Sequence, residues 1–315
     1  MVTARLTCTV CVVVLDRFAA MERCLDSLFR LAVPLGTDLD VVVVDNGSRD
    51  GTWEMLQTYA AHEPRLTVTR LEGSVGRARN AALAAAKGDL VAFTDSDCEP
   101  EPGWLVHGVV PFADPAVAVV QGRTVPGGAT DRPWAVTQDI GSRSGLFEAC
   151  NILYRRELLL AAGGFGEDIG FFGEDTVAGW RVLRAGGAAA FAHEAVVRHD
   201  VTFPGYRWHL GRARYYAHWP ALVAEFPEVR DTLLWHRWFL RRRSAESTAA
   251  LLGLLLALVT RRPGAAVAGV PLLWRHRPRG RTRADLRDAG GALLFDVAVS
   301  AALVEGSVRS RTLLL

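Results

Sequence analysis

The sequence has no uninterrupted apolar run of the roughly 20 residues that a membrane-spanning helix needs. Residues 249–259 are eleven apolar residues closed by Arg261 and Arg262, and the apolar residues 265–274 precede the basic segment 275–279. Short apolar segments with basic clusters at their ends are typical of helices that bind an anionic leaflet. We expect interfacial or re-entrant helices here; a true span and a helical bundle packed on the rest of the protein stay open as alternatives.

Cysteine is also sparse, and its positions form no recognisable framework. Cys8, Cys11, Cys24, Cys98 and Cys150 are odd in number and scattered along the chain. Cys8 and Cys11 have the C-x-x-C spacing, but neither a second pair nor a histidine cluster follows them. We therefore interpret the cysteines as buried thiols in a reducing cytosol, and not as metal ligands or redox centres.

No strong charge excess is present. The formal net charge is +2, with 22% of the residues charged and 50% apolar, which is a globular composition and gives no support to nucleic-acid binding. The charge is unevenly distributed, however. Residues 1–204 carry 18 basic and 26 acidic side chains, whereas residues 205–290 carry 16 and 6. A basic and apolar C-terminal third favours contact with a membrane surface.

Short β-branched runs alternate with longer helical stretches over the first two-thirds of the chain. The expected strands are residues 7–15, 39–45, 66–71 and 90–95, with helices between them. The first run has no small-residue cleavage site after it, so it favours a buried strand over a signal peptide. Continuous apolar strands separated by helices are typical of an open, mostly parallel α/β sheet sandwiched by helices. We predict this domain over residues 1–225 and a helical, basic and apolar C-terminal appendage over residues 226–315.

Polar side chains stand where two of these strands end. Asp45 and Asn46 follow one strand, and Asp95 and Asp97 follow another. Ligands of open α/β sheets bind beyond the carboxyl ends of the strands. Two carboxylates one residue apart also suit a hard divalent cation, Mg²⁺ or Mn²⁺, although solvated turns contain Asp-x-Asp as well.

Two further segments admit a structural and a functional interpretation. The segment 45–52 (DNGSRDGT) contains turn and helix-cap residues, yet Asp45 or Asn46 at the strand tip can also hydrogen-bond a nucleobase edge. Arg79 lies near the start of a predicted helix, where a basic residue opposes the helix dipole. An anion such as a diphosphate docked there would make this position favourable.

A second acidic pair precedes a later helix. Glu174 and Asp175 follow Gly173, and acids in the first turn of a helix often only complement the helix dipole. Beside a bound sugar acceptor, one of them would be a general base that takes a hydroxyl proton. His199 ends the expected strand 188–197; such a histidine is usually structural, but a neutral imidazole near an oxygen-bound metal can be a further ligand.

Together these motifs resemble family 2 glycosyltransferases of the GT-A fold. The segments that carry the resemblance are VVVVDNGSRDGT at 41–52, VGRARNAALAAAKGDLVAFTDSDCEP at 75–100, ACNILYRRELLLAAGGFGED at 149–168, FGEDTVAGWRVLRAG at 172–186 and VRH at 197–199. The resemblance covers about residues 7–220, and the order of the motifs is more specific than any one of them. It implies a GT-A fold and an inverting, nucleotide-sugar-dependent transfer, with Asp45 or Asn46 at the donor base and Arg79 near the diphosphate.

The same resemblance implies roles for the remaining acids. Asp97 would be the primary metal ligand, and Asp95 would contact the ribose and the metal. His199 would contact the metal or the diphosphate. Asp175 would be the catalytic base, with Glu174 the less favoured residue for that role.

The chain departs from the family pattern after its first strand. The family usually has Pro-Thr-Tyr-Asn-Arg there, whereas this chain has Val-Val-Leu-Asp-Arg at 13–17, which leaves the donor base undetermined. The processive-synthase signature Gln-x-x-Arg-Trp is also missing; LWHRW at 234–238 lacks its glutamine. We therefore expect one sugar to be transferred per turnover.

The expected activity is that of a hexosyltransferase that uses Mg²⁺ or Mn²⁺ in cell-envelope, lipid-linked or polysaccharide glycan synthesis. Its expected partners are a nucleotide-sugar, a carbohydrate or lipid-linked acceptor and a membrane surface, and its expected place is cytoplasmic, peripheral or re-entrant at the inner face of the cell membrane. Two other classes stay open. A nucleotidyltransferase would need a glycine-rich basic loop that this sequence lacks. A degenerate nucleotide-sugar-binding scaffold at the membrane would explain the altered first motif.

Overall fold

The computed structural model describes residues 7–33, 38–168, 173–278 and 280–315, and the chain divides into two compact units. Unit 1 contains Met1–Ala129 and Thr137–Val201, and unit 2 contains Thr130–Val136 and Thr202–Leu315. We predicted a boundary after residue 225. Residues 202–225 instead group with the C-terminal helices, because η2 (Ala213–His218) and α8 (Trp219–Glu225) pack on α12 (Arg283–Ser310). The catalytic role of the first part of the chain and the membrane association of the second part stay predictions.

Unit 1 is built on one eight-stranded sheet with the order β3-β2-β1-β4-β7-β6-β8-β5. The strands are β1 (Thr7–Val14), β2 (Asp38–Asp45), β3 (Leu66–Arg70), β4 (Leu90–Asp95), β5 (Cys98–Pro100), β6 (Val117–Pro126), β7 (Asn151–Arg155) and β8 (Ala188–His199). Strands β3, β2, β1 and β4 are parallel, whereas β7 is antiparallel to both of its neighbours. The predicted open α/β sheet with helices is confirmed, and the observed sheet is mixed. Strands β5, β6 and β7 were not among the strands we predicted.

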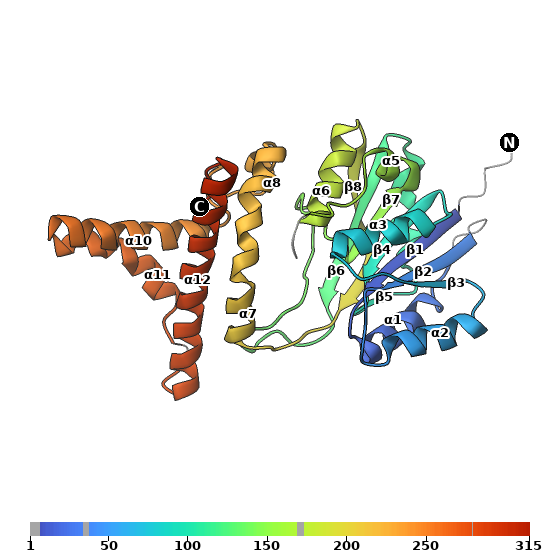
Figure 1. Ribbon diagram of the computed structural model, residues 1–315, viewed down its shortest axis with the longest axis horizontal. Helices are drawn as coiled ribbons and strands as arrows, with labels where there is room; N and C mark the ends of the chain where they lie inside the picture. Colours follow the sequence, from blue (N-terminus) through green and yellow to red (C-terminus); the bar gives the residue numbers. More distant parts are fainter. Residues whose placement is uncertain (1–6, 34–37, 169–172, 279) are drawn as a thin grey trace. The chain divides into compact units, whose positions relative to one another are not determined.

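Helices cover both faces of this sheet, which is why its central strands are continuous apolar runs. The helices of unit 1 are α1 (Phe18–Leu28), α2 (Thr52–His62), α3 (Val75–Ala85), α4 (Trp104–Gly108), η1 (Val110–Ala113), α5 (Arg156–Ala161) and α6 (Glu174–Arg184). Figure 1 shows α1 and α2 on one face and α3 and α6 on the other. Met21 and Leu25 of α1 are fully buried against the sheet, as are Ala78 and Ala82 of α3.

The carboxyl ends of the parallel strands bring two predicted acids to one edge. Asp45, the last residue of β2, pairs in register with Val14 of β1, and Asp95, the last residue of β4, pairs with Val13. The two residues therefore lie on the two strands that flank the end of β1. This edge of the sheet, where the polar residues follow the strands, is the one that the sequence pattern indicated.

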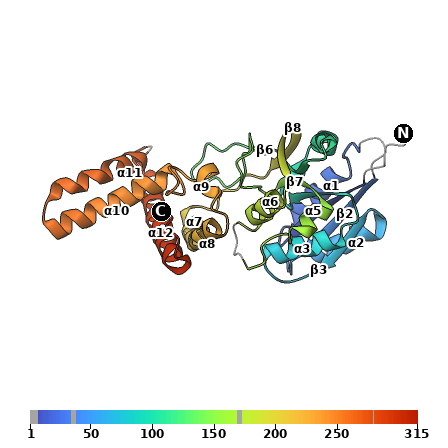
Figure 2. The ribbon, with the colours of Figure 1, turned by 90° about the horizontal axis from the view of Figure 1, so that it is seen from above.

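Unit 2 is helical. Besides η2, α8 and α12 it contains α7 (Tyr206–Arg212), α9 (Val229–Thr232), α10 (Arg242–Thr260), η3 (Pro263–Gly269) and α11 (Val270–Arg275). In Figure 2, α10 and α11 lie side by side as a hairpin. The predicted apolar run 249–259 lies inside α10. Both α10 and α12 are long and apolar enough to cross a membrane, by length and composition alone.

Candidate active site

The Asp-x-Asp motif lies in the tight turn between β4 and β5, and a histidine from a distant strand faces it. Because β5 pairs antiparallel with β8, Cys98 lies opposite His199 in the sheet. The Nε2 atom of His199 is 3.8 Å from Oδ1 of Asp97, and Nη2 of Arg17 is 3.9 Å from Oδ2 of the same carboxylate. The fold thus brings the predicted metal ligands Asp97 and His199 close together, although they lie far apart in the sequence.

This cluster has the donor atoms of a site for a hard cation. Ligand atoms of Asp97, Cys98 and His199 all lie within 4.8 Å of one another. The Nδ1 atom of His199 is 2.9 Å from the carbonyl oxygen of Asp200; a proton on Nδ1 would leave the lone pair of Nε2 directed to the side of Asp97. Burial raises the pKa of the Cys98 thiol well above its ordinary value, which favours its neutral form.

Burial also raises the pKa of Asp97 above its ordinary value. The neighbouring negative charge of Asp95 adds to this effect, while His199 and Arg17 oppose it. A carboxylate that is partly desolvated beside a second carboxylate is stabilised by a positive charge. The site therefore favours a cation between these groups.

Arg79 joins the metal-motif side of the site to the second acidic pair. Its guanidinium donates to Oδ1 of Asp95 at 3.0 Å and forms a second ion pair with Glu174, and its side chain is nearly buried. Burial on its own lowers the pKa of Arg79, but the charges of Glu174 and Asp95 raise it by more, so the guanidinium stays charged. Its contact with a diphosphate stays a prediction, since the structure shows two carboxylates as its partners.

Glu174 and Asp175 begin α6 and differ in their surroundings. Glu174 is 4% exposed and paired with Arg79; burial and the charge of Asp175 raise its pKa to about 7. Asp175 is partly exposed, and its two oxygens accept the backbone N–H groups of Thr176 at 2.7 Å and Ala149 at 3.2 Å. Burial raises the pKa of Asp175 above its ordinary value as well. Of the two acids, Asp175 is the more exposed residue, and its part in catalysis stays a prediction.

Asp45 and Asn46 are built into the loops around the end of β2. Asp45 is fully buried; its Oδ1 accepts the N–H groups of Gly47 and Ser48, both at 3.0 Å, and lies 3.2 Å from Nε of Arg70. Its Oδ2 is buried and has no hydrogen-bond partner among the described residues. The amide of Asn46 exchanges two hydrogen bonds with the backbone of Gly73, at 2.9 and 3.0 Å. The turn interpretation of these residues therefore holds, and their contact with a nucleobase stays a prediction.

Two residues of the site were not among our predictions. Arg17 was noticed only as part of the altered first motif, yet it approaches Asp97. Glu148 lies close to Asp175, and burial together with the charge of Asp175 raises its pKa to about 7. The position of Arg17 just after a strand end was a usable signal, whereas nothing in the local sequence marks Glu148.

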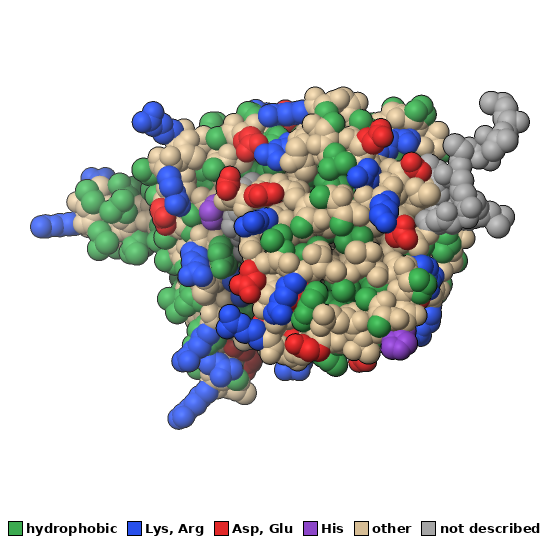
Figure 3. All heavy atoms as spheres, turned by 45° about the vertical axis from the view of Figure 1, so that its right-hand side comes forward, with side chains coloured by type: hydrophobic (Ala, Val, Ile, Leu, Met, Phe, Trp, Pro, Cys, Tyr) green, Lys and Arg blue, Asp and Glu red, His purple; other side chains and the backbone are tan. Residues whose placement is uncertain are grey.

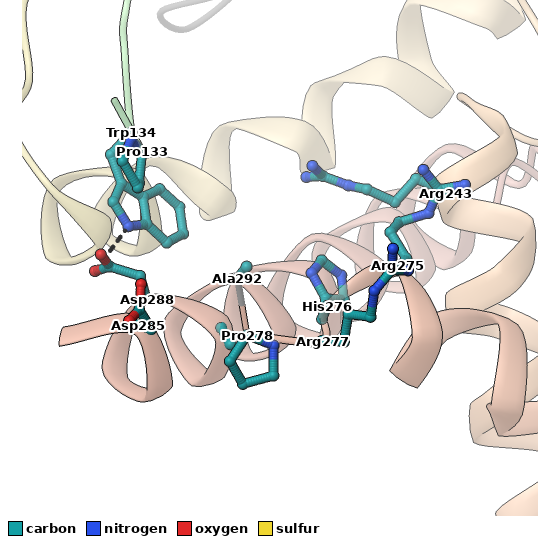
Figure 4. Close-up of a pocket in the computed structure, with 11 residues that line it drawn as sticks. Pro133, Trp134, Arg243, Arg275, His276, Arg277, Pro278, Asp285, Asp288 and Ala292 are labelled. Carbon is teal, nitrogen blue, oxygen red and sulfur yellow. Dashed lines mark hydrogen bonds between the residues drawn. The ribbon is translucent and has the colours of Figure 1, made fainter. Parts of the chain in front are cut away.

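A cavity of about 380 Å³ lies within unit 2 and contains none of the predicted site residues. Figure 4 shows Arg243, Arg275 and Arg277 along one side of it and Trp134, hydrogen-bonded to Asp288, on the other. The acids described above belong to unit 1, so this cavity is a feature of the helical unit and not of the acidic cluster.

Comparisons with known proteins place the chain among sugar-transferring enzymes. The family model described as Glycosyl transferase family 2 matches residues 9–168. Glycosyltransferase AglE of Haloferax volcanii is 28% identical over 196 residues, which are 57% of this chain and 62% of that protein. The pre-mycofactocin glycosyltransferase of Mycobacterium tuberculosis is 31% identical over 51% of this chain and 37% of that protein. The chain thus matches less than two-thirds of the length of these relatives.

Solved structures extend the likeness of the fold to nearly the whole chain. The mannosyltransferase PcManGT of Pyrobaculum calidifontis, in complex with GDP-Man and Mn²⁺, has a TM-score of 0.62 and 24% identity over 98% of this chain and 88% of that one. TarS 1-349 of S. aureus, in complex with UDP-GlcNAc, has a TM-score of 0.52 and 19% identity over 97% and 92%. With the family match over residues 9–168 and the strand-end acids in place, the chain belongs to glycosyltransferase family 2 and is a glycosyltransferase of the GT-A fold.

Proposed function

We propose that this glycosyltransferase moves one hexosyl group from a nucleotide-sugar to an acceptor hydroxyl by a cation-dependent, inverting single displacement. The observation that carries the proposal is the position of Arg79, which binds Asp95 of the metal motif on one side and Glu174, the neighbour of Asp175, on the other. The buried guanidinium of Arg79 thus fixes the side chain of Asp95, which lies in the same motif as the proposed metal ligand Asp97. It also fixes the start of α6, which carries the proposed base Asp175. Such a fixed arrangement is what positioned catalysis requires.

Asp97 and His199 fit Mg²⁺ or Mn²⁺, with Asp95 as a further ligand. A carboxylate oxygen and an imidazole nitrogen are ligands that these cations accept, and they leave positions for diphosphate oxygens and water. When bound, the cation supplies charge stabilisation to the departing nucleoside diphosphate. The Mn²⁺ in the complex of PcManGT supports this assignment.

Asp175 is the proposed general base. It takes the proton of the acceptor hydroxyl while the acceptor oxygen attacks the anomeric carbon from the side opposite to the diphosphate. Its raised pKa makes it a better proton acceptor than an exposed carboxylate, and the two backbone N–H groups hold its orientation. Glu174 is less suited to the role because its carboxylate is occupied by Arg79.

The proposed donor-base contact is Asp45. Its buried Oδ2 lacks a hydrogen-bond partner among the described residues, and an N–H group of a nucleobase would satisfy it once the loops around Asp45 open to admit the base. Asn46 then acts indirectly, because its amide holds the β2–α2 loop to the loop before α3. These two hydrogen bonds would keep the two loops beside the proposed nucleobase contact in one conformation.

The acceptor is proposed to be a carbohydrate or a lipid-linked saccharide in cell-envelope glycan synthesis. The support for this is unit 2, whose helices α10 and α12 are long and apolar enough for a bilayer. The enzyme would then be cytoplasmic, with a peripheral or re-entrant attachment to the inner face of the cell membrane.

A catalytically inactive binding scaffold is the second candidate. The replacement of the usual first motif by Val-Val-Leu-Asp-Arg at 13–17 favours it, whereas the intact acids Asp95, Asp97 and Asp175 oppose it. Incubation with a nucleotide-sugar in the absence of an acceptor separates the two candidates. An enzyme releases nucleoside diphosphate slowly by transfer to water, and a scaffold releases none.

Thermal unfolding with a panel of nucleoside diphosphates and Mn²⁺ tests the donor site. A ligand that binds only the folded state at 100 times its dissociation constant adds about 2.7 kcal/mol of stability. We expect one of UDP, GDP, CDP, ADP or dTDP to raise the melting temperature in the presence of Mn²⁺. Asp97→Asn should remove most of this shift, and the exposed control Glu54→Gln should keep it. If no diphosphate shifts the wild-type transition, the proposal is wrong.

A further inference from the structure

Helix α10 is unusual because it is apolar and exposed around most of its circumference. Exposed fractions run from 40% at Leu251 to 74% at Val259, with five more leucines between them exposed by at least 52%. At about 100° per residue these positions cover an arc of about 200°, and Gly253 lies outside it. The side that contains Gly253 packs closely on η3, since a Cβ atom on Gly253 would lie 2.6 Å from the carbonyl oxygen of Ala265. The uncovered surface is therefore a belt and not a stripe.

This belt does not fit a helix that lies on a membrane surface. A surface helix and an interfacial helix both have one polar face that meets water. Residues 249–259 contain no polar side chain, so α10 has no face for water along this length. A helix that is apolar on all sides is stable only when apolar material surrounds it.

Basic side chains mark the two ends of the hairpin. Arg241, Arg242 and Arg243 lie at the start of α10, Arg261 and Arg262 at its turn, and Arg275 and Arg277 at the end of α11. Glu246 is the one acid between residues 241 and 278, and it is paired with Arg242 and Arg275. Figure 3 shows the projecting hairpin covered by hydrophobic side chains, with basic side chains at its tip. Such ends match the phosphate groups of anionic lipids.

The apolar part of α10 is shorter than the hydrocarbon layer. Residues 249–259 span about 16 Å at about 1.5 Å per residue, whereas the hydrocarbon layer of a bilayer is about 30 Å thick. The belt can therefore enter the hydrocarbon layer without crossing it, while the long arginine side chains at its ends extend toward the headgroups.

We propose that α10, η3 and α11, the α10–α11 hairpin, insert into the hydrocarbon layer of a bilayer that contains anionic lipids. This deepens the membrane contact of the proposed function and rests on it, but it does not depend on the transfer chemistry of unit 1. A second copy of the chain is the competing occupant. Its hairpin could cover the belt, but that hairpin contains one acid, Glu246, which is already paired with Arg242 and Arg275.

Vesicle binding of single aspartate variants tests the insertion. Leu255 is 57% exposed, so Leu255→Asp removes little packing within the chain, while an aspartate at the centre of a hydrocarbon-inserted helix weakens binding by about 100-fold. Val110→Asp is the matched control, since Val110 is an apolar residue of unit 1 with 62% exposure. We expect wild type and Val110→Asp to float with phosphatidylglycerol-containing vesicles and Leu255→Asp to stay in solution.

The depth of the hairpin is measured with a fluorophore on Leu255→Cys. All five native cysteines are buried, so an introduced exposed thiol is labelled selectively. When the label is inserted into hydrocarbon, its emission maximum shifts to shorter wavelength. Its fluorescence is then quenched by lipids brominated on their acyl chains, but not by aqueous iodide. The same label on Val110→Cys should respond in the opposite way. Iodide quenching at position 255 on bound vesicles would show a surface-lying helix and overturn the inference.

The role of lipid charge is tested with Arg277→Gln. In the described part of the chain Arg277 contacts Trp274 and makes no ion pair with a carboxylate, so its loss does not strand an acid. Removing one arginine near the headgroups weakens binding to phosphatidylglycerol vesicles by about 5-fold and leaves binding to phosphatidylcholine vesicles unchanged. Arg30→Gln, on an exposed residue of unit 1, should change neither.

The outcomes separate this inference from the donor-site proposal. Nucleoside diphosphate stabilisation with Mn²⁺ is measured on the same variants and should be the same in wild type, Leu255→Asp and Arg277→Gln. A different outcome would identify a second copy of the chain as the partner of the belt. In that case the wild-type protein stays in solution without detergent as a dimer, and Leu255→Asp dissociates this dimer. If the wild-type protein binds vesicles but no nucleoside diphosphate, the donor-site proposal is wrong and the hairpin inference stands.

Discussion

At the scale of single residues, Arg79 shows where sequence reasoning reaches its limit. Its place near a helix start predicted a docked anion such as a diphosphate, which stays a prediction, and the structure shows two carboxylates of the chain beside it. Asp95 is 16 residues away and Glu174 is 95 residues away. The kind of partner could be predicted from the helix dipole, but its identity depends on tertiary packing that no local pattern contains.

Arg79→Met should destabilise unit 1 strongly. The substitution leaves the buried carboxylate of Glu174 without its cation, and breaking a buried ion pair from one side costs about 3–5 kcal/mol. Urea unfolding followed by circular dichroism measures the change. Arg77→Met on the same helix is the control; Arg77 is exposed, so its loss should change the free energy of unfolding by less than about 0.5 kcal/mol. Equal effects of both substitutions would contradict the bridging role of Arg79.

Glu148 should make stability depend on pH. Burial raises its pKa from 4.5 to about 7, so the folded state binds a proton that the unfolded state has already lost between these values. The contribution of Glu148 is therefore complete below about pH 4.5 and is lost as the pH rises through 7. Glu148→Gln stays neutral and should gain about 1–3 kcal/mol relative to wild type on going from pH 5 to pH 8. Parallel stability curves for the two proteins would show that Glu148 is ionised throughout.

At the scale of elements, the parallel half of the sheet was predictable and the other half was not. Strand β4 has the bounds that its apolar run indicated, and its last residue is the predicted Asp95. A continuous apolar run ended by a polar residue is a local signal. The antiparallel pairing of β7 with β4 and β6 joins segments distant in the chain, and β7 itself is only five residues long. Its place, and with it the approach of Glu148 to Asp175, follows from tertiary packing.

The position of α6 against the loop before β7 depends on one glycine. A Cβ atom on Gly179 would lie 2.1 Å from the ring of Phe147, which is buried, so Gly179→Ala forces the helix or the ring to move. We expect a loss of about 1–3 kcal/mol of stability and reduced transfer, because Asp175 belongs to the same helix. Gly290→Ala is the contrasting helical substitution. It has open space around it and should stabilise the protein by about 0.5–1 kcal/mol. Gains at both positions would show that α6 packs less tightly than described.

At the scale of the whole molecule, acidic and basic residues are concentrated in different parts of the chain. The acids of the candidate active site all belong to unit 1, and the excess of basic residues lies between 205 and 290. The change in composition near residue 205 lies close to the start of the main segment of unit 2 at Thr202, where α7 and α8 pack on α12. The sequence motifs predicted the family, since the segments that carry the resemblance follow one another in order along unit 1.

The most direct test of the account compares Asp97→Asn and Asp175→Asn in transfer and in Mn²⁺-dependent nucleoside diphosphate binding, each measured on the same preparation. Transfer should fall in both by about 100-fold or more, because one substitution removes the proposed main metal ligand and the other removes the proposed base. Diphosphate binding should be lost in Asp97→Asn and kept in Asp175→Asn. Equal loss of diphosphate binding in the two variants would contradict the assignment of Asp175 as the proton acceptor.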